Sequence, residues 1–227
     1  MHIEPVVWDS DFFGYPIGKL ILNHDEVIDA EVCSKSAYKL IYVFSESALT
    51  VKQQNGVHAD LVDCKVDLEV FSKAEPISSN GHIVPIRELT PKLLDLVYQS
   101  GHYSRFKLDK QFANREFEQL YLEWITKALN DKDQQVLGFM EEDKLVGFVT
   151  LGNKSSAANI GLIAVDEMYR GKSIGKHLIR ESHRFAQQNR LNKITVTTQW
   201  VNDGAMQFYL QQGFEVVKKL YIYHLWK

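Results

Sequence analysis

A turn rich in glycine and positive charge is the part of this 227-residue sequence best suited to chemistry. The apolar run Ile160–Val165 leads into residues 169–176, YRGKSIGK, and an amphipathic helical pattern begins inside that turn. A strand, a turn and a helix N-terminus in this order direct several backbone N–H groups and the positive end of a helix at one spot. The arrangement predicts a binding site for an anion such as a pyrophosphate.

The residue types in the turn support this interpretation. Gly171 and Gly175 let the backbone approach a phosphate closely and allow a positive φ where one is required. Arg170, Lys172 and Lys176 add positive charge. Neither G-x-x-x-x-G-K-[ST] nor G-x-G-x-x-G occurs here, so the sequence supports neither a P-loop NTPase nor a Rossmann dinucleotide site.

The turn resembles the acetyl-CoA motif of the GNAT N-acetyltransferases, usually [QR]-x-x-G-x-[GA] directly after a strand. Arg170 takes the first position and Gly175 the last, whereas Ser173 stands in place of the middle glycine. A serine keeps the backbone donor, can add a hydroxyl donor, and is tolerated if its φ is negative. The resemblance implies that CoA contacts the following residues: Arg170, Gly171, Lys172, Ser173, Ile174, Gly175 and Lys176.

A second GNAT pattern, N-x-x-A-x-x-[FL]-Y-x-x-x-G-F, follows in the expected order. Its positions are occupied by Asn202, Ala205, Phe208, Tyr209, Gly213 and Phe214. The resemblance, which covers residues 84–227, implies that Asn202, Ala205, Phe208 and Tyr209 contact acetyl-CoA. It also implies that the Tyr209 hydroxyl is directed at the CoA sulfur. For Phe208, packing in the core explains the residue by itself.

Acetyl transfer to an amine needs proximity, a site for the oxyanion, and a proton for the leaving thiolate. In GNAT proteins the thioester lies along the strand that is here Ile160–Val165. The resemblance implies that this strand contacts the cofactor at Leu162, Ile163, Ala164 and Val165. It also implies that backbone N–H groups around Leu162–Ala164 bind the carbonyl oxygen of the thioester. Tyr209, with an ordinary pKa of about 10, suits a thiolate leaving group of pKa about 8–9. The expected cofactor is acetyl-CoA, with no metal, since no Cys/His cluster has zinc spacing.

The alternation of β-rich runs with helical-period runs predicts an α/β fold. The predicted strands cover residues 17–22, 39–44, 59–71, 83–89, 135–140, 145–151, 159–165, 193–198 and 215–226. The predicted helices cover residues 25–38, 47–55, a segment from Pro91, 114–129, 173–189 and 203–212. The GNAT resemblance implies a mixed central sheet flanked by helices. Ser72–His82, rich in Pro, Gly, Ser and Asn, is the best linker candidate, and it divides the chain into 1–75 and 83–227.

The first half carries a weak repeat of the second, because the segments that begin at Ala48 and Ala205 both run helix, glycine, apolar residue, strand. Either this is a common connection, or the first half is a degenerate GNAT-like half-domain with Lys52 in place of Tyr209. The segments IEPVVWDSDFFG and SRFKLDKQFANREFEQLYLEWITKAL resemble the dTDP-fucosamine acetyltransferases of bacterial surface-polysaccharide synthesis. Those proteins combine such a half-domain with a GNAT domain.

That second resemblance implies an acceptor that is a nucleotide-linked amino-sugar, namely a dTDP-4-amino-4,6-dideoxyhexose. Tyr103, Ser104, Arg105 and Phe106 fall between the first two GNAT helices, in a segment that faces the acceptor in this family. A guanidinium suits a diphosphate, although a surface salt bridge explains Arg105 equally well. Tyr103 or Phe106 could stack on a base or sugar.

The base that takes the amine proton is harder to identify. Asp63 and Asp67 lie two residues either side of Lys65, hence on one face of the long strand, and Asp63 is our candidate. A solvated stripe is the alternative, and lone residues such as His102 and His224 are poorer candidates. Two other functions stay open: an N-acetyltransferase of an amino acid, polyamine or peptide N-terminus, and a CoA-responsive binding module. Tyr209 argues against the module.

Composition narrows the class of protein. A net charge of −3 gives no basic footprint for nucleic acid, and no apolar run approaches the roughly 20 residues needed to span a membrane. The N-terminus shows no secretory signal, and two cysteines are too few for a disulfide framework. We therefore expect a cytoplasmic protein, and the family resemblance adds the expectation of a homodimer.

Overall fold

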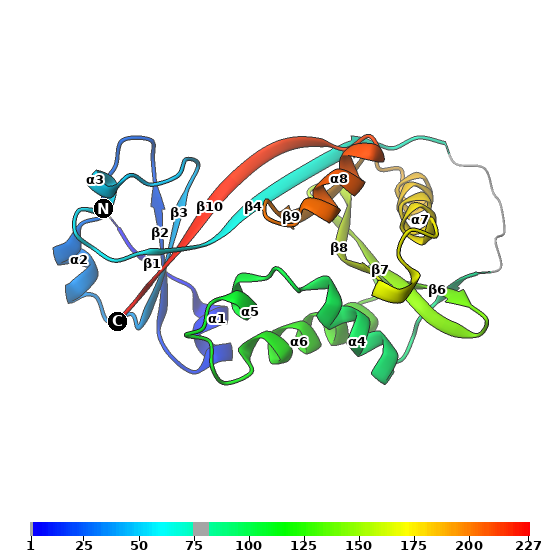
Figure 1. Cartoon of the computed structure of the whole chain (residues 1–227), viewed down its shortest axis with the longest axis horizontal. Coiled ribbons are helices and arrows are strands. Elements are labelled where there is room, and N and C mark those ends of the chain that lie inside the picture. Colours follow the sequence, from blue (N-terminus) through cyan, green and yellow to red (C-terminus); the bar gives the residue numbers. More distant parts are fainter. Residues whose placement is uncertain (1, 75–81) are drawn as a thin grey trace. The chain divides into compact units, whose positions relative to one another are not determined.

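The computed structural model describes residues 2–74 and 82–227, and its internal contacts divide the chain into two compact units. The first unit holds Met1–Val66, Gln199–Val201 and Lys218–Lys227, and the second holds Asp67–Thr198 and Asn202–Val217. Two long strands, β4 (Asp60–Phe71) and β10 (Glu215–Trp226), each contribute residues to both units (Figure 1). The division therefore falls inside β4 rather than in Ser72–His82. Part of that expected linker, residues 75–81, lies outside the described residues.

The first unit is an α/β unit with a small mixed sheet. The strands β1 (Glu4–Pro5), β2 (Ile17–Leu22) and β3 (Leu40–Ser45) lie in that order, and β10 follows as the next neighbour of β3. β2 and β3 are parallel and are joined through α2 (Ala30–Lys35), whereas β10 is antiparallel to β3. The other helices of this unit are α1 (Val7–Phe13) and α3 (Val51–Gln54).

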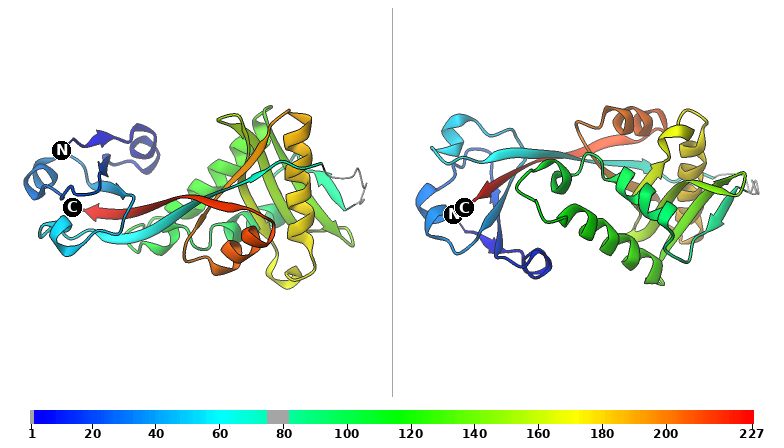
Figure 2. Two further views of the ribbon diagram at one scale, coloured as in Figure 1. Left: turned by 90° about the horizontal axis from the view of Figure 1, so that it is seen from above. Right: turned by 60° about the horizontal axis from the view of Figure 1, so that its bottom comes forward.

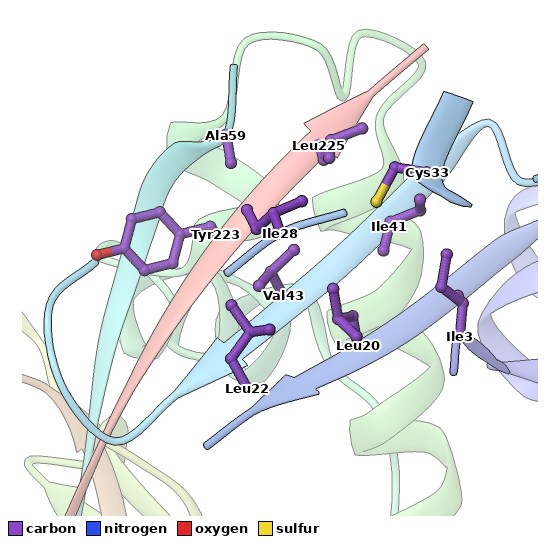
Figure 3. Close-up of a cluster of buried hydrophobic side chains, with 10 residues drawn as sticks. All are labelled: Ile3, Leu20, Leu22, Ile28, Cys33, Ile41, Val43, Ala59, Tyr223 and Leu225. Carbon is purple, nitrogen blue, oxygen red and sulfur yellow. The ribbon is translucent and has the colours of Figure 1, made fainter. Parts of the chain in front are cut away.

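One buried cluster forms the core of the first unit (Figure 3). Cross-strand register builds it, because Val43 of β3 lies opposite both Leu20 of β2 and Tyr223 of β10. The cluster consists of Ile3, Leu20, Leu22, Ile28, Cys33, Ile41, Val43, Ala59, Tyr223 and Leu225. Burial of these side chains, each worth about 1.5–3 kcal/mol for a large aliphatic residue, holds α2 on the sheet.

Side-chain caps make two helices of this unit shorter than predicted. The Asp29 carboxylate accepts the N–H groups of Glu31 and Val32, so α2 begins at Ala30 and not at residue 25. Thr50 and Gln53 form a capping box, so α3 covers four residues of the predicted 47–55. α1 was not predicted at all. The predicted strands 17–22, 39–44 and 59–71 are confirmed to within one residue.

The second unit has a larger mixed sheet with helices on both faces. Its strand order is β4-β9-β8-β7-β6-β5, in which β5 to β8 are antiparallel neighbours and β8 and β9 are parallel. The strands are β5 (Ile83–Pro85), β6 (Gln134–Glu141), β7 (Lys144–Lys154), β8 (Ala157–Val165) and β9 (Lys193–Gln199). The helices are α4 (Pro91–Ser100), α5 (Arg105–Leu108), α6 (Glu116–Asn130), α7 (Ile174–Gln188) and α8 (Asp203–Gln211). α4 and α6 lie on one face of the sheet and α7 on the other (Figure 2).

Local sequence signals account for most of this unit. Pro91 opens α4 after the Thr90 cap, as predicted. The strand predicted over 83–89 is shorter and covers Ile83–Pro85. Glu142 and Asp143 both have positive φ and form the two-residue turn of the hairpin between β6 and β7, whose flanking residues Glu141 and Lys144 are paired. None of the helices in residues 2–74 and 82–227 combines the length and the apolarity that crossing a membrane requires.

Candidate functional site

The basic turn lies at the carboxyl end of β8 and leads directly into α7. Arg170, Gly171, Lys172, Ser173 and Lys176 are all exposed there. The N–H of Lys176 donates to the Ser173 carbonyl at 3.0 Å, so the N–H groups that lack a carbonyl one turn earlier in the helix are those of Ile174 and Gly175. The exposed cations and the helix N-terminus therefore form one anion-binding surface.

Ser173 adopts a left-handed conformation, with a φ of 64°. The condition under which serine is tolerated here, a negative φ, is therefore not met, because the chain reverses between the short 3-10 turn Glu167–Tyr169 and α7. A left-handed residue suits glycine and costs another residue about 1–2 kcal/mol. Ser173 also precedes α7 without making the side-chain cap that serine usually supplies.

Gly175 serves close packing rather than backbone freedom. A Cβ atom at this position would lie 3.0 Å from two ring carbons of Phe208, so the glycine allows α7 to approach α8. Gly171 is the opposite case, since it has a φ of +81° and an added Cβ would meet nothing. Glycine thus suits the two positions for different physical reasons: close packing at Gly175 and a positive φ at Gly171.

Two ion pairs hold the turn and the end of β8. The Lys172 ammonium lies 3.2 Å from a Glu141 carboxylate oxygen, and the Lys92 ammonium of α4 binds the largely buried Asp166. Asp166 also accepts the N–H of Met168 at 2.9 Å. The hydrogen bond from Lys92 and then the one from Met168 hold the pKa of Asp166 below its usual range. Sequence reasoning missed Lys92 and Asp166, because they are 74 residues apart.

β8 and β9 separate close to this turn. They pair only through Ala158–Ile160 and Ile194–Val196, although β8 continues to Val165 and β9 to Gln199. Residues 161–165 of β8 therefore present an unpaired edge on the side of β9. An unpaired edge offers N–H and C=O groups to an extended ligand.

A β-bulge lies at the point of separation. Val149 is opposite Ile163 and Leu151 is opposite Ile160, so Thr150 of β7 faces two residues, Gly161 and Leu162. The Thr150 hydroxyl accepts the Leu162 N–H at 2.8 Å, and its oxygen would lie 2.7 Å from a Cβ at Gly161. Thr150 and Gly161 together allow the bulge to form.

The bulge decides which N–H groups face the open edge. The N–H of Leu162 points to β7, and so does that of Asp166, which binds the Val146 carbonyl at 2.9 Å. Because backbone groups alternate in direction along a strand, the N–H of Ala164 also points to β7. The N–H groups of Ile163 and Val165 therefore point to the open edge. Of the expected donors Leu162–Ala164, only Ile163 has the required direction.

Tyr209 lies in α8, which Asn202 caps by accepting the N–H of Ala205 at 3.2 Å. Its side chain is only 4% exposed and packs between the rings of Phe208 and Phe214, each at 5.4 Å between centroids. Burial raises the pKa of Tyr209 well above its ordinary value. The phenol is therefore protonated at neutral pH and can donate its proton or a hydrogen bond.

The residues expected to face the acceptor differ in burial, since two are buried and two are accessible to solvent. Ser104 caps α5 and is buried, and Phe106 is buried against Phe112 at 5.3 Å. Arg105 is half-buried, with its guanidinium 4.4 Å from the Phe106 ring centre, and Tyr103 is 36% exposed. Only Tyr103 and Arg105 present side chains that a ligand can reach.

The two candidate carboxylates fall in different units. Asp63 is buried in the first unit, whereas Asp67 is the first residue of the second unit and is half-buried. Asp67 accepts the Thr197 hydroxyl at 2.6 Å. His224 is buried against Tyr42, with ring centres 5.0 Å apart. Within the described ranges, no group of three or more His, Cys, Asp or Glu side chains could hold a metal ion.

Comparison with known proteins agrees with this geometry. The family model described as "Acetyltransferase (GNAT) family" matches residues 101–214, which is half of the chain. The chain is 26% identical to the dTDP-fucosamine acetyltransferase of Escherichia coli O6:H1 strain CFT073 over 96% of both chains. A spore coat polysaccharide biosynthesis protein, SpsD of Bacillus subtilis strain 168, is 23% identical over 60% of this chain and 47% of its own length. The chain thus spans about half of SpsD but nearly all of the Escherichia coli protein.

A solved structure shows the fold over nearly the whole chain. It is a functionally unknown conserved protein from Staphylococcus epidermidis, with a TM-score of 0.61 and 13% identity over 94% of this chain and 84% of that one. The family match covers the basic turn, the unpaired edge of β8 and Tyr209. These findings confirm the predicted fold and the predicted class of enzyme, an N-acetyltransferase that uses acetyl-CoA. The chain belongs to the GNAT family of acetyltransferases.

Proposed function

We propose that this enzyme acetylates the amino group of a nucleotide-linked amino-sugar, specifically a dTDP-4-amino-4,6-dideoxyhexose used in surface polysaccharide synthesis. The support is the similarity to a dTDP-fucosamine acetyltransferase over 96% of both chains, together with the similarity to a polysaccharide biosynthesis protein. Tyr103 and Arg105 support it as well, because they present an aromatic ring and a guanidinium beside α5. A guanidinium binds a diphosphate well.

In this proposal the CoA pyrophosphate binds at residues 170–176, where Arg170, Lys172 and Lys176 supply charge and the N-terminus of α7 supplies N–H groups. The Arg170 side chain already donates to the Val165 carbonyl at 3.1 Å, which orients it at the end of β8. The rest of the cofactor extends along the unpaired edge of β8, so that its thioester reaches the bulge at Gly161 and Leu162. The separation of β8 and β9 is the observation that carries the proposal.

The transfer is a direct attack of the amine on the thioester. The Ile163 N–H polarises the carbonyl and stabilises the oxyanion as the C–N bond forms. When the C–S bond breaks, the thiolate takes the proton of Tyr209. Asp63 remains a proposed base for the amine, and the two cysteines have no role in this reaction.

Replacing Tyr209 by phenylalanine tests the leaving-group step. We expect Tyr209→Phe to lower kcat by 10²-fold or more, the usual range for a general acid, while acetyl-CoA binding measured by calorimetry stays intact. Tyr121→Phe is the matched control, since Tyr121 is also a buried tyrosine of the second unit. Unchanged turnover in Tyr209→Phe would remove the phenol from the mechanism.

A panel of amines tests the acceptor. CoA release is followed with dTDP-4-amino-sugars, UDP-amino-sugars, polyamines and amino acids, at equal concentrations. We expect the highest kcat/KM with a dTDP-4-amino-sugar. Activity confined to polyamines or amino acids would show that the sugar assignment is wrong, and acetyl-CoA binding without turnover of any amine would favour a binding module. A homodimer and a cytoplasmic location remain predictions, which light scattering and cell fractionation check.

A further inference from the structure

Gly161 is exposed although β8 is an interior strand of the second unit's sheet. A helix or a neighbouring side chain normally covers a residue of an interior strand, so the exposure of Gly161 means that neither covers the sheet at this point. A polar pocket of about 340 Å³ adjoins it. The pocket is lined by residues of three neighbouring strands and the segment before them: Asp131, Asp133, Gln134, Gly152, Asn153, Lys154, Asn159 and Gly161.

Cross-strand register places this pocket on one face of the sheet. Gly152 is the partner of both Gln134 and Asn159, and the Asn159 amide donates to the Thr195 hydroxyl at 3.1 Å, so these residues share a face. Gly147, five residues before Gly152, lies against Ile174 and Leu178 of α7. An odd separation along a strand reverses the face, so the pocket lies on the face opposite α7.

The pocket and the basic turn therefore reach the bulge from different directions. α7, which follows the basic turn, covers one face, and the pocket opens on the other, with Gly161 and the unpaired edge of β8 between them. Two substrates that enter in this way would meet at the bulge without competing for one space. A bisubstrate reaction needs this arrangement.

A carboxylate lies on the same face as the pocket. Thr197 directly follows Val196, the last residue of β9 that pairs with β8, as Gly161 follows Ile160, so both residues lie where the two strands begin to separate. Thr195 and Thr197 share one face of β9, and the Thr197 hydroxyl donates to Asp67 at 2.6 Å. Glu69, the next carboxylate on that face of β4, is instead bound to the Lys193 ammonium at 2.6 Å. Asp67 is thus held by a neutral donor and Glu69 by a cation.

We propose that the pocket over Gly161 takes the amine-bearing end of the acceptor, and that Asp67, oriented by Thr197, accepts the proton that the amine must lose. The proposal rests on acetyl transfer to an amine as the function, and it moves the base from Asp63 to Asp67. The charged lining residues are two carboxylates, Asp131 and Asp133, and one ammonium, Lys154, so the balance of charge is negative and attracts an ammonium group. A volume of about 340 Å³ is near the lower limit for ligand pockets in proteins. The pocket therefore suits one sugar ring or a small amine but not a whole nucleotide-sugar.

The protons balance in this scheme. The ammonium form of the acceptor gives one proton to the Asp67 carboxylate, and the neutral nitrogen then attacks the thioester carbon. The C–N bond forms, the C–S bond breaks, and the thiolate takes the Tyr209 proton. The nitrogen gives up a second proton, which restores Tyr209, and the proton on Asp67 is released to water.

Four variants of the full chain test the base. Asp67→Asn should lower kcat/KM for the best amine of the panel by 10²–10⁴-fold, the range of a general base, with the Kd for acetyl-CoA unchanged. Glu69→Gln is the matched control and should stay within a few-fold of wild type. Asp63→Asn separates the two candidate bases, because only a role of Asp63 as the base predicts a large loss in that variant. In Asp67→Gly, added formate should restore part of the lost turnover, because it supplies a carboxylate in the space that the substitution opens.

Three further variants test the geometry. Thr197→Val should lower kcat by a smaller factor without changing acetyl-CoA binding, and Thr197→Ser should restore it, so the role of Asp67 can be tested even if Asp67→Asn does not fold. Asn153→Trp should narrow the pocket and raise KM for the amine, leaving the Kd for acetyl-CoA as it was.

The outcomes separate this inference from the proposed function. The inference that Asp67 is the base is supported if the wild-type chain and Glu69→Gln are active and Asp67→Asn is inactive. Wild-type turnover in Asp67→Asn, or a loss only in Asp63→Asn, would overturn the inference and leave acetyl transfer standing. A wild-type chain that releases no CoA with any amine would overturn both.

Discussion

Gly175 at the start of α7 lies so close to Phe208 of α8 that a single methyl group would come within 3.0 Å of the ring. Phe208 precedes Tyr209, so this contact joins the basic turn to the proposed proton donor. The spacing between two helices is therefore set by the absence of a side chain. A change at the turn can thus reach Tyr209 through packing alone.

Gly175→Ala tests this connection. We expect it to lower kcat as well as acetyl-CoA affinity, and to cost about 1–3 kcal/mol in the free energy of unfolding, because a tightly packed contact must shift. Phe208→Leu in the same chain should recover part of both losses by making room. Steady-state kinetics and urea unfolding measure the two effects, and an alanine variant with wild-type kcat and stability would contradict them.

Ser173→Gly should improve the turn. Glycine adopts the observed φ of 64° without the steric cost that serine bears, so we expect the free energy of unfolding to rise by roughly 1 kcal/mol or less. The KM for acetyl-CoA should fall or stay constant, since the backbone donor is kept. Ser173→Ala is the control, because it removes the hydroxyl and keeps the strain. A higher KM in both variants would instead show that the Ser173 hydroxyl binds the cofactor.

Thr150→Val should damage the bulge. Thr150 is 2% exposed and its hydroxyl accepts the Leu162 N–H, so valine leaves that N–H without its acceptor at a cost of about 1–3 kcal/mol. We expect kcat to fall as well, because the bulge directs the Ile163 N–H to the open edge. Thr150→Ser keeps the acceptor and should retain most of the activity. Equal kinetics in the valine and serine variants would exclude this role of the hydroxyl.

The Lys92–Asp166 ion pair should stabilise the protein in a defined pH range. The pKa of Asp166 is lowered in the folded chain, so its contribution is fully present above the unfolded-state value of about 3.9. The contribution is lost as the pH falls through the lower folded-state pKa. Lys92→Met should therefore destabilise the chain by a constant amount, on the order of 1–2 kcal/mol, between pH 8 and pH 5.

Urea unfolding of wild type and Lys92→Met over that range checks the ion pair. Asp95→Asn is the control, since Asp95 also binds Lys92, at 2.9 Å, but is more exposed than Asp166. Its effect should be much smaller. A Lys92→Met effect that grows as the pH falls from 8 to 5 would show that the sign is wrong.

Sequence patterns alone located the parts of the site that are local. The basic turn, the α7 pattern after it and the α8 signature with Tyr209 each depend on residues within one segment, and hydrophobic periodicity reports such segments directly. The hairpin at Glu142 and Asp143 was predictable for the same reason. The long strands β4 and β10 were predicted to within one residue because their alternation extends over twelve residues.

Only the tertiary structure decided how these segments meet. The φ of Ser173 follows from the direction in which the chain must leave β8, and the role of Gly175 follows from Phe208 in another helix. Thr197 and Asp67, 130 residues apart, come together through strand order, which no local period encodes. A periodic pattern states which face of a strand is covered, but the neighbour and the register depend on the packing of the whole sheet. For this reason the sequence identified the acetyl-CoA turn and Tyr209, whereas the pocket over Gly161 and the choice between Asp63 and Asp67 required the fold.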